Sequence, residues 1–271
     1  MAMDGIAQAD ALVRSRRDEL AGMLRVSVPV VLGKYLLSKV VSEFLIGHPR
    51  AHVNLEVTDR ITDMVSEGVD LCVRLGPSSS DLALVSRVLA RPSAGLYASA
   101  TYLHEHGVPH TPHDLPGHPT LHLGTLDQKP SWSLHRGSQR VTLPLTPILQ
   151  TNDIPTLLNA AARACGICMV PHFVCQAEGL PETLLQVLPE WEHAPVDVRA
   201  LYPSHRSVTP LLRAFLNLLA ERAPTVLNFQ PQHGGEGLGS IEGQRPAELA
   251  GANGWNASPL GSLTSIDGDG S

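Results

Sequence analysis

Two groups of side chains in this sequence could bind a metal ion or form a redox pair. Six histidines lie between His104 and His122, but that stretch is rich in proline and has no cysteine. A zinc site needs convergent ligands on ordered elements, so this pattern disfavours a metal. Cys165 and Cys168 have the spacing of a redox pair, yet they straddle the predicted end of a helix and an apolar strand. We interpret them as core thiols and expect no metal and no other cofactor.

The patterns of the common catalytic sites are missing from the sequence. It has no Gly-x-Ser-x-Gly elbow, no phosphate-binding loop and no dinucleotide fingerprint. We therefore expect that the protein is not an enzyme. The polar groups of interest lie instead at the ends of predicted strands, which indicates a binding function.

The residues from Leu24 to Gly76 predict alternating strands and helices. The expected order is strand, turn and helix, strand, short helix and strand, with the elements at 24–29, 35–47, 52–58, 61–68 and 71–76. Short connections between such elements favour a parallel sheet covered by helices. The carboxyl ends of its strands would carry the ligand site, because helix N-termini expose N–H groups there. This arrangement predicts a pocket for a small, anionic molecule.

The rest of the chain predicts a second α/β lobe and a return to the first. Strands are expected at 95–98, 120–123, 131–134, 140–143, 147–151 and 167–171, with helices at 99–106 and 154–164. A strand at 197–202 and a helix from Thr209-Pro210 then follow the style of the first lobe. The chain would cross between the lobes near Pro92 and Pro195, which implies a hinged pair.

Composition and charge exclude several classes of protein. The chain has 271 residues, of which 43% are hydrophobic, and a net charge of −6. It therefore lacks the basic character that marks a nucleic-acid-binding surface. No secretory signal begins the sequence and no apolar stretch is long enough to span a membrane, so we expect a cytoplasmic protein without membrane contact. Beyond Pro224 the chain is rich in glycine, which predicts disorder.

Short motifs follow one another in a characteristic order through most of the chain. In the first part they are Leu24 to Pro29, Phe44-Leu45, His48-Pro49, Asp59-Arg60, Glu67 to Leu71 and Arg74 to Gly76. Later ones are Ala98-Ser99, Tyr102-Leu103, Gly107, Pro109, Thr111-Pro112, Asp114-Leu115, Gly117-His118, Trp132, Asn152-Asp153, Gly166-Ile167, Val170-Pro171 and Tyr202 to Ser204. This ordered set resembles the effector-binding domain of LysR-type transcriptional regulators, over about residues 24–223.

The resemblance implies an α/β fold with two Rossmann-like lobes, as in type 2 periplasmic binding proteins, and an inducer cleft between them. Residues 1–23 would be the remnant of a linker helix, whereas the glycine-rich tail at 225–271 is not part of the family pattern and is expected from its composition to be disordered. Lobe I would comprise residues 24–92 and 196–224, and lobe II residues 93–195.

The resemblance also implies which residues form the inducer pocket. Relatives often have a polar residue at the place of Val31, so here the helix N–H groups and Thr58 would contact a carboxylate. Thr58 is open to a second interpretation as a strand-end cap, and Asn152 as a helix cap. Arg74 has two possible roles, as a structural ion-pair residue or as a ligand contact. The implied ligand-binding residues are Pro29, Val30, Val31, Thr58, Leu75, Gly76, Leu123, Gly124, Thr125, Asn152, Asp153, Val170 and Pro171.

The function implied by the resemblance is regulation of transcription in response to a small inducer, which we expect to be an organic acid. Family members form homodimers or tetramers and contact DNA through an N-terminal winged helix-turn-helix. Only the end of the linker helix after that module is recognisable here, so we expect no DNA binding by these residues. A solute-binding receptor of the periplasmic type is the alternative, which the missing signal peptide disfavours.

Overall fold

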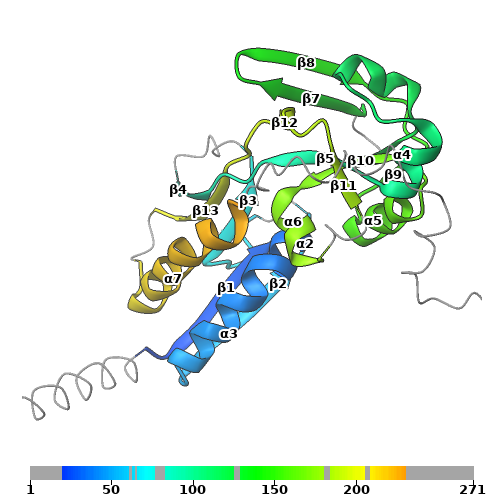
Figure 1. The fold of residues 1–271 in the computed structure, drawn as a ribbon. Coiled ribbons are helices and arrows are strands. Elements are labelled where there is room, and N and C mark those ends of the chain that lie inside the picture. Colours follow the sequence, from blue (N-terminus) through cyan, green and yellow to red (C-terminus); the bar gives the residue numbers. More distant parts are fainter. Residues whose placement is uncertain are drawn as a thin grey trace, which may run out of the picture.

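The computed structural model describes residues 20–60, 63–64, 66–76, 83–124, 129–179, 184–204 and 208–229. These residues form two α/β lobes, each built on its own β-sheet (Figure 1). The expectation of a two-lobed α/β fold is confirmed. Residues 1–19 of the predicted linker helix, Thr125 and the predicted tail beyond residue 229 lie outside the described residues. Gly22 and Met23, which we assigned to the linker helix, belong to the first strand instead.

Lobe I is built on a five-stranded sheet. Its strands, in their order across the sheet, are β2 (Ala51–Val57), β1 (Gly22–Val28), β3 (Leu71–Leu75), β13 (Val198–Pro203) and β4 (Leu84–Ala90). β1 is parallel to β2 and to β3, whereas β13 is antiparallel to both of its neighbours. The carboxyl ends of β1, β2 and β3 therefore share one edge of the sheet, as the alternating pattern predicts.

A single helical segment follows β1 without a break. It consists of α2 (Val30–Leu32), η1 (Gly33–Leu37) and α3 (Ser38–Gly47), and η1 is a π-helical turn. The expected turn after the strand is wrong, because the helix begins directly at Val30. A Cβ on Gly33 would lie 2.8 Å from Cγ1 of Val57, so only glycine lets this helix lie so close to β2.

The last helix, α7 (Pro210–Leu227), packs beside α3 on the sheet of lobe I (Figure 1). The predicted start is confirmed, since Oγ1 of Thr209 accepts a hydrogen bond from the N–H of Leu212 at 3.1 Å. The buried rings of Phe44 and Phe215 meet edge to face, with centroids 5.0 Å apart. The helix continues through Pro224 to Leu227, so the expected disorder is wrong for residues 225–227, whose Leu227 is buried in the core.

Lobe II is built on an eight-stranded sheet. Across the sheet its strands are β8 (Gln139–Pro144), β7 (Ser131–Arg136), β12 (Glu192–His193), β5 (Ala94–Ser99), β10 (Ile167–Pro171), β6 (Thr120–Leu123) and β9 (Leu149–Thr151), and β11 (Leu184–Val187) also pairs with β5. The helical elements are α4 (Ala100–His106), η2 (Pro112–Gly117), α5 (Ile154–Ala162) and α6 (His172–Ala177). β6 is parallel to β9 and to β10, so these three strands end at the same edge.

The lobes are connected by two chain crossings and by packed apolar side chains. The crossings run side by side, because the N–H of Val196 donates to the carbonyl of Pro92 at 3.0 Å. One buried apolar cluster extends from lobe I into lobe II. Within it, the rings of Tyr35 on η1 and Phe173 on α6 are 5.8 Å apart. The two lobes are therefore packed against each other next to the crossings.

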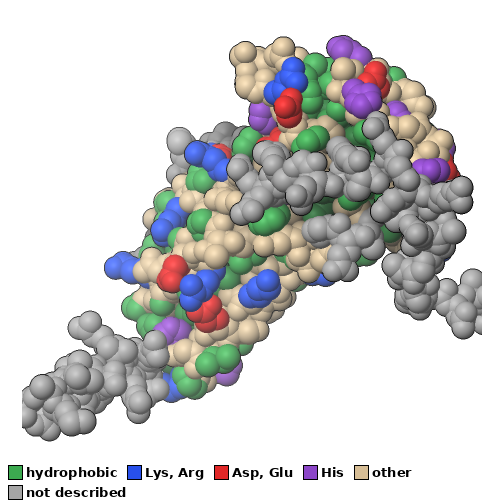
Figure 2. Space-filling view, viewed as in Figure 1, with side chains coloured by type: hydrophobic (Ala, Val, Ile, Leu, Met, Phe, Trp, Pro, Cys, Tyr) green, Lys and Arg blue, Asp and Glu red, His purple; other side chains and the backbone are tan. Residues whose placement is uncertain are grey.

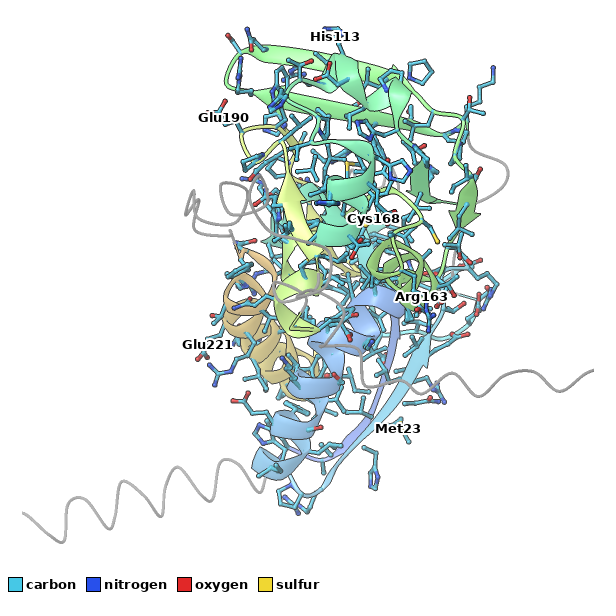
Figure 3. All side chains as sticks on the ribbon, turned by 45° about the vertical axis from the view of Figure 1, so that its right-hand side comes forward. Met23, His113, Arg163, Cys168, Glu190 and Glu221 are labelled. Atoms are coloured by element: carbon cyan, nitrogen blue, oxygen red, sulfur yellow. The ribbon has the colours of Figure 1, made fainter. Side chains whose placement is uncertain are left out.

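Two local expectations need correction. Cys168 is buried inside lobe II (Figure 3), but Cys165 is exposed and is not a core thiol. The reason is that α5 ends at Ala162 and Ala164 has a φ of 61°, which places Cys165 in a turn outside the core. The short helix expected at 61–68 is also wrong for its described residues, since Met64 and residues 66–68 form a turn.

Candidate ligand pocket between the lobes

A pocket of about 240 Å³ lies between lobe I and lobe II. Lobe I contributes the start of the helix at 30–47 and Asp59, the second residue after β2, while lobe II contributes the ends of β6 and β9 and the start of α5. Because β1 and β2 are parallel, as are β6 and β9, both lobes direct strand ends and a helix start at this space. The lining residues are Val30, Val31, Lys34, Tyr35, Asp59, Leu123, Asn152, Asp153, Ile154 and Pro155.

The pocket brings together part of the predicted site. The predicted residues that line it are Val30, Val31, Leu123, Asn152 and Asp153. Pro29 and Gly124 adjoin lining residues along the chain but do not line the pocket themselves. The two lobes thus meet at the ends of β1, β6 and β9.

Thr58 and Arg74 do not line the pocket. Oγ1 of Thr58 accepts a hydrogen bond from the N–H of Arg60 at 3.2 Å, which is the strand-end capping contact. Nη2 of Arg74 donates to the hydroxyl of Ser27 at 3.2 Å and to the carbonyl of Arg60 at 3.4 Å. Both side chains therefore support the backbone of lobe I.

The other predicted residues lie beside the crossings and not in the pocket. The N–H of Gly76 donates to the carbonyl of Asp197 at 2.9 Å, and the N–H of His172 donates to the carbonyl of Ser93 at 3.2 Å. The crossing segments therefore cover the ends of the central strands β3 and β10. The predicted residues in this region are Leu75, Gly76, Val170 and Pro171.

Glu178 of lobe II binds two lobe I side chains that line the pocket. Nζ of Lys34 and the hydroxyl of Tyr35 both donate to Oε1 of Glu178, at 2.6 Å and 2.7 Å. The hydrogen bonds from Lys34 and then from Tyr35 hold the pKa of Glu178 below its ordinary value. The same bond raises the pKa of Lys34, while burial is the main reason why the pKa of Tyr35 is raised. We call these three residues the interlobe contact.

Sequence reasoning missed the interlobe contact because no local pattern encodes it. Lys34 and Glu178 are 144 positions apart, and each is an ordinary surface residue of its own segment. The one available signal is Gly33, which begins the π-helical turn that contains Lys34 and Tyr35. Such turns are frequent at functional sites.

Two carboxylates line the pocket. Oδ1 of Asp59 accepts a hydrogen bond from the N–H of Val30, the first residue of the helix, at 3.1 Å. Oδ2 of Asp153 accepts from the N–H of Thr156 at 2.9 Å and from its hydroxyl at 2.6 Å. The hydrogen bonds from Thr156 lower the pKa of Asp153. Asp153 rather than Asn152 is thus the cap of α5, and Asp59 is a lining residue that the predicted site did not include.

The histidines for which we expected no metal site lie in lobe II. They gather over the end of the lobe that contains α4 and η2 (Figure 2). The ring of His106 stacks on Tyr102 with centroids 4.5 Å apart, and Nδ1 of His118 lies 2.9 Å from the Tyr102 hydroxyl. In the part of the chain that the structure describes, no group of three or more His, Cys, Asp or Glu side chains could hold a metal ion.

Comparison with known protein families shows to which family this chain belongs. The family model described as "LysR substrate binding domain" matches residues 17–224. The chain belongs to this family. The resemblance inferred from the ordered motifs is therefore confirmed.

Relatives of the LysR-type chain carry the names of transcriptional regulators. An HTH-type transcriptional regulator of Haemophilus influenzae is 30% identical over 199 residues, which are 73% of this chain and 69% of the relative. The probable HTH-type transcriptional regulator LtrA of Klebsiella pneumoniae is 27% identical, over 83% of this chain and 73% of the relative.

Solved structures of LysR-type proteins share the fold. The regulatory domain of CrgA from Neisseria meningitidis matches with a TM-score of 0.65 and 22% identity, covering 75% of this chain and 100% of that domain. Full-length AphB, a virulence activator of Vibrio cholerae, matches with a TM-score of 0.65 and 22% identity, covering 82% of this chain and 75% of AphB. Among the described residues of this chain, no helix is both long and apolar enough to cross a membrane.

Proposed function

We propose that this chain is the effector-binding part of a LysR-type transcription regulator and binds a small, partly apolar organic acid between its lobes. The observation that carries the proposal is the pocket lined by strand ends and helix starts from both lobes. A ligand there touches lobe I and lobe II at once. It shifts the equilibrium between lobe arrangements only to the extent that it binds them with different affinities.

A pocket-filling variant tests this proposal. Val30 lines the pocket and is 50% exposed, so Val30→Trp places a large ring in the binding space with little damage to the core. We expect a thermal-shift screen of aromatic and aliphatic acids to find compounds that raise the Tm of the unmodified protein but not that of Val30→Trp. Ile148→Trp is the matched control, because Ile148 is 64% exposed and lines neither the pocket nor the proposed interface. Equal responses of both variants would contradict the proposed site.

Homodimers or higher oligomers are the second part of the proposal. The outer strand β2 and the neighbouring helix α3 expose the apolar residues Val57, Leu45 and Ile46. Exposed apolar residues of this kind support a protein interface. Light scattering after size exclusion should give a dimer or tetramer for the unmodified chain and a smaller species for Ile46→Glu. A monomeric unmodified chain would refute this part.

DNA contact belongs, in this proposal, to the winged helix-turn-helix of the family and not to the residues described here. The net charge of −6 supports this division, because DNA binding relies on neutralising phosphates with basic side chains. A gel-shift experiment with this chain should show no sequence-specific complex, and a salt-resistant, specific complex would refute the division. We place the protein in the cytoplasm and assign no catalysis to it, in keeping with the regulator names of its relatives.

A further inference from the structure

The position in the pocket that suits a carboxylate is already held by a side chain of the protein. A carboxylate entering from solvent would be attracted to the free N–H groups at the start of the helix at 30–47. In the structure, the N–H of Val30 instead donates to Oδ1 of Asp59 at 3.1 Å. Asp59 also lines the pocket. An acidic ligand and Asp59 would therefore need the same place.

Asp59 differs from the other carboxylate of the pocket in how it is attached. Asp153 caps its own helix, where it bonds the N–H three residues later, as helix caps commonly do. Asp59 lies 29 positions from Val30 and belongs to the segment after β2. The β1–β2 ladder ends one residue earlier, where the N–H of Thr58 donates to the carbonyl of Val28 at 2.8 Å. Asp59 can leave the helix start without breaking that ladder.

The charges around the pocket oppose the binding of an acidic ligand at the position that Asp59 holds. Asp59, Asp153 and Glu178 are carboxylates, and the only cation among the lining residues is Lys34. Lys34 is engaged by Glu178 at 2.6 Å, so its charge is already compensated. An acidic ligand is therefore repelled by the uncompensated carboxylates. Asp59 is the one nearest to the helix start.

We propose that Asp59 determines the charge selectivity of the pocket by acting as an internal competitor of an acidic inducer. Deepening the proposed function, this inference states that the carboxylate of the inducer binds at Val30 only by replacing that of Asp59. The N–H of Val30 is already bonded to Asp59, and only an acid with enough apolar contact to the other walls displaces Asp59. Asp59 thereby sets the inducer concentration at which the protein responds.

Benzoate and benzamide are suitable probes, because they have the same shape and differ in charge. In Asp59→Asn the side chain keeps an oxygen for the N–H of Val30 but loses the charge. We expect calorimetry to show benzoate binding about tenfold tighter to Asp59→Asn than to the unmodified protein, and benzamide binding changed less than about twofold. Asp59→Ala, which also vacates the position, should bind benzoate at least as tightly as Asp59→Asn. The benzoate gain should shrink as salt is added, because salt screens the repulsion that was removed.

Glu190→Gln is the matched control. It removes one negative charge at a side chain that is 71% exposed, at the far end of lobe II from the pocket (Figure 3). It should leave benzoate binding unchanged. Benzoate binding that is no tighter in either Asp59 variant, including no measurable binding in any of them, overturns the inference. The proposed function fails separately, if no acid in the thermal-shift screen distinguishes Val30→Trp from Ile148→Trp.

Discussion

Removal of Glu178 should shift the protein away from the lobe arrangement of this structure. In Glu178→Ala, Lys34 and Tyr35 both lose their hydrogen-bond acceptor on lobe II. Glu178→Gln offers an intermediate case, because its amide oxygen still accepts from the Tyr35 hydroxyl while the charge is gone. The two substitutions together separate the ion pair from the hydrogen bond.

The structure allows the size of this shift to be estimated. The side chains of Lys34 and Glu178 are 49% and 34% exposed, so water screens their attraction. An exposed pair of this kind contributes about 0.5 kcal/mol. Tyr35 is buried, and a hydrogen bond from it to a carboxylate contributes about 1.5 kcal/mol. Glu178→Ala should therefore disfavour the packed arrangement by about 2 kcal/mol, or roughly 30-fold in population.

Spin-label distances between the lobes provide the assay. Cys165 is the exposed cysteine of lobe II, whereas Cys72, Cys168 and Cys175 are buried, so Cys165 can be labelled selectively. Lys39→Cys on the exposed side of α3 supplies the label on lobe I. We expect one dominant distance in the parent, a second population in Glu178→Ala and a smaller one in Glu178→Gln.

The control for this experiment is an ion pair confined to lobe II. Nη1 of Arg136 and Oε2 of Glu190 are 2.8 Å apart, and both residues belong to lobe II. Glu190→Ala should leave the interlobe distance unchanged. An unaltered distance distribution in Glu178→Ala would show that apolar packing alone holds the lobes, and the reasoning would then be wrong.

The interlobe contact also has a defined dependence on pH. The pKa of Glu178 is lowered, so its contribution is present while it is ionised and is lost as the pH falls through that pKa, below the ordinary 4.5. The pKa of Lys34 is raised, so its contribution is lost only as the pH rises through a value above 10.5. The population of the packed lobe arrangement, as measured by the spin-label distances, should therefore be constant between about pH 6 and pH 9.

Three further predictions concern the packing and the helix cap near the pocket, and each is tested by urea unfolding of the named variants. Phe215→Ala removes a fully buried ring between α7 and α3 and should cost about 3–5 kcal/mol; a loss below about 1 kcal/mol would mean that this contact is not part of the core. Gly166→Ala should be destabilising by about 1–3 kcal/mol, since its Cβ would lie 2.4 Å from the carbonyl oxygen of Pro119, whereas Gly117→Ala, with nothing within 4 Å, should change stability little. Asp153→Ala removes the cap of α5 and should cost about 1 kcal/mol, and an unchanged stability would argue against the capping bond.

Local pattern was enough to locate most elements and part of the pocket. The strand before Pro29 and the start of α7 at Thr209 follow from the β-rich run, helical spacing and capping residues, and the pattern places the cap of α5 at the pair 152–153 without selecting Asp153. Each of these signals depends only on residues a few positions apart, so it can be recognised from the sequence alone. The ends of parallel strands share an edge in any such sheet, so Val30 could be expected at the candidate pocket, whereas Asn152 was implied by the family resemblance.

The sheet order and the contacts between lobes were decided only by the tertiary structure. The crossing segments cover the ends of β3 and β10, and for that reason Gly76 and Pro171 lie beside the crossings and not in the pocket. The bonds of Glu178 to Lys34 and of Asp59 to Val30 join residues far apart in the chain. No periodicity encodes such pairs, because each depends on how complete elements pack against one another.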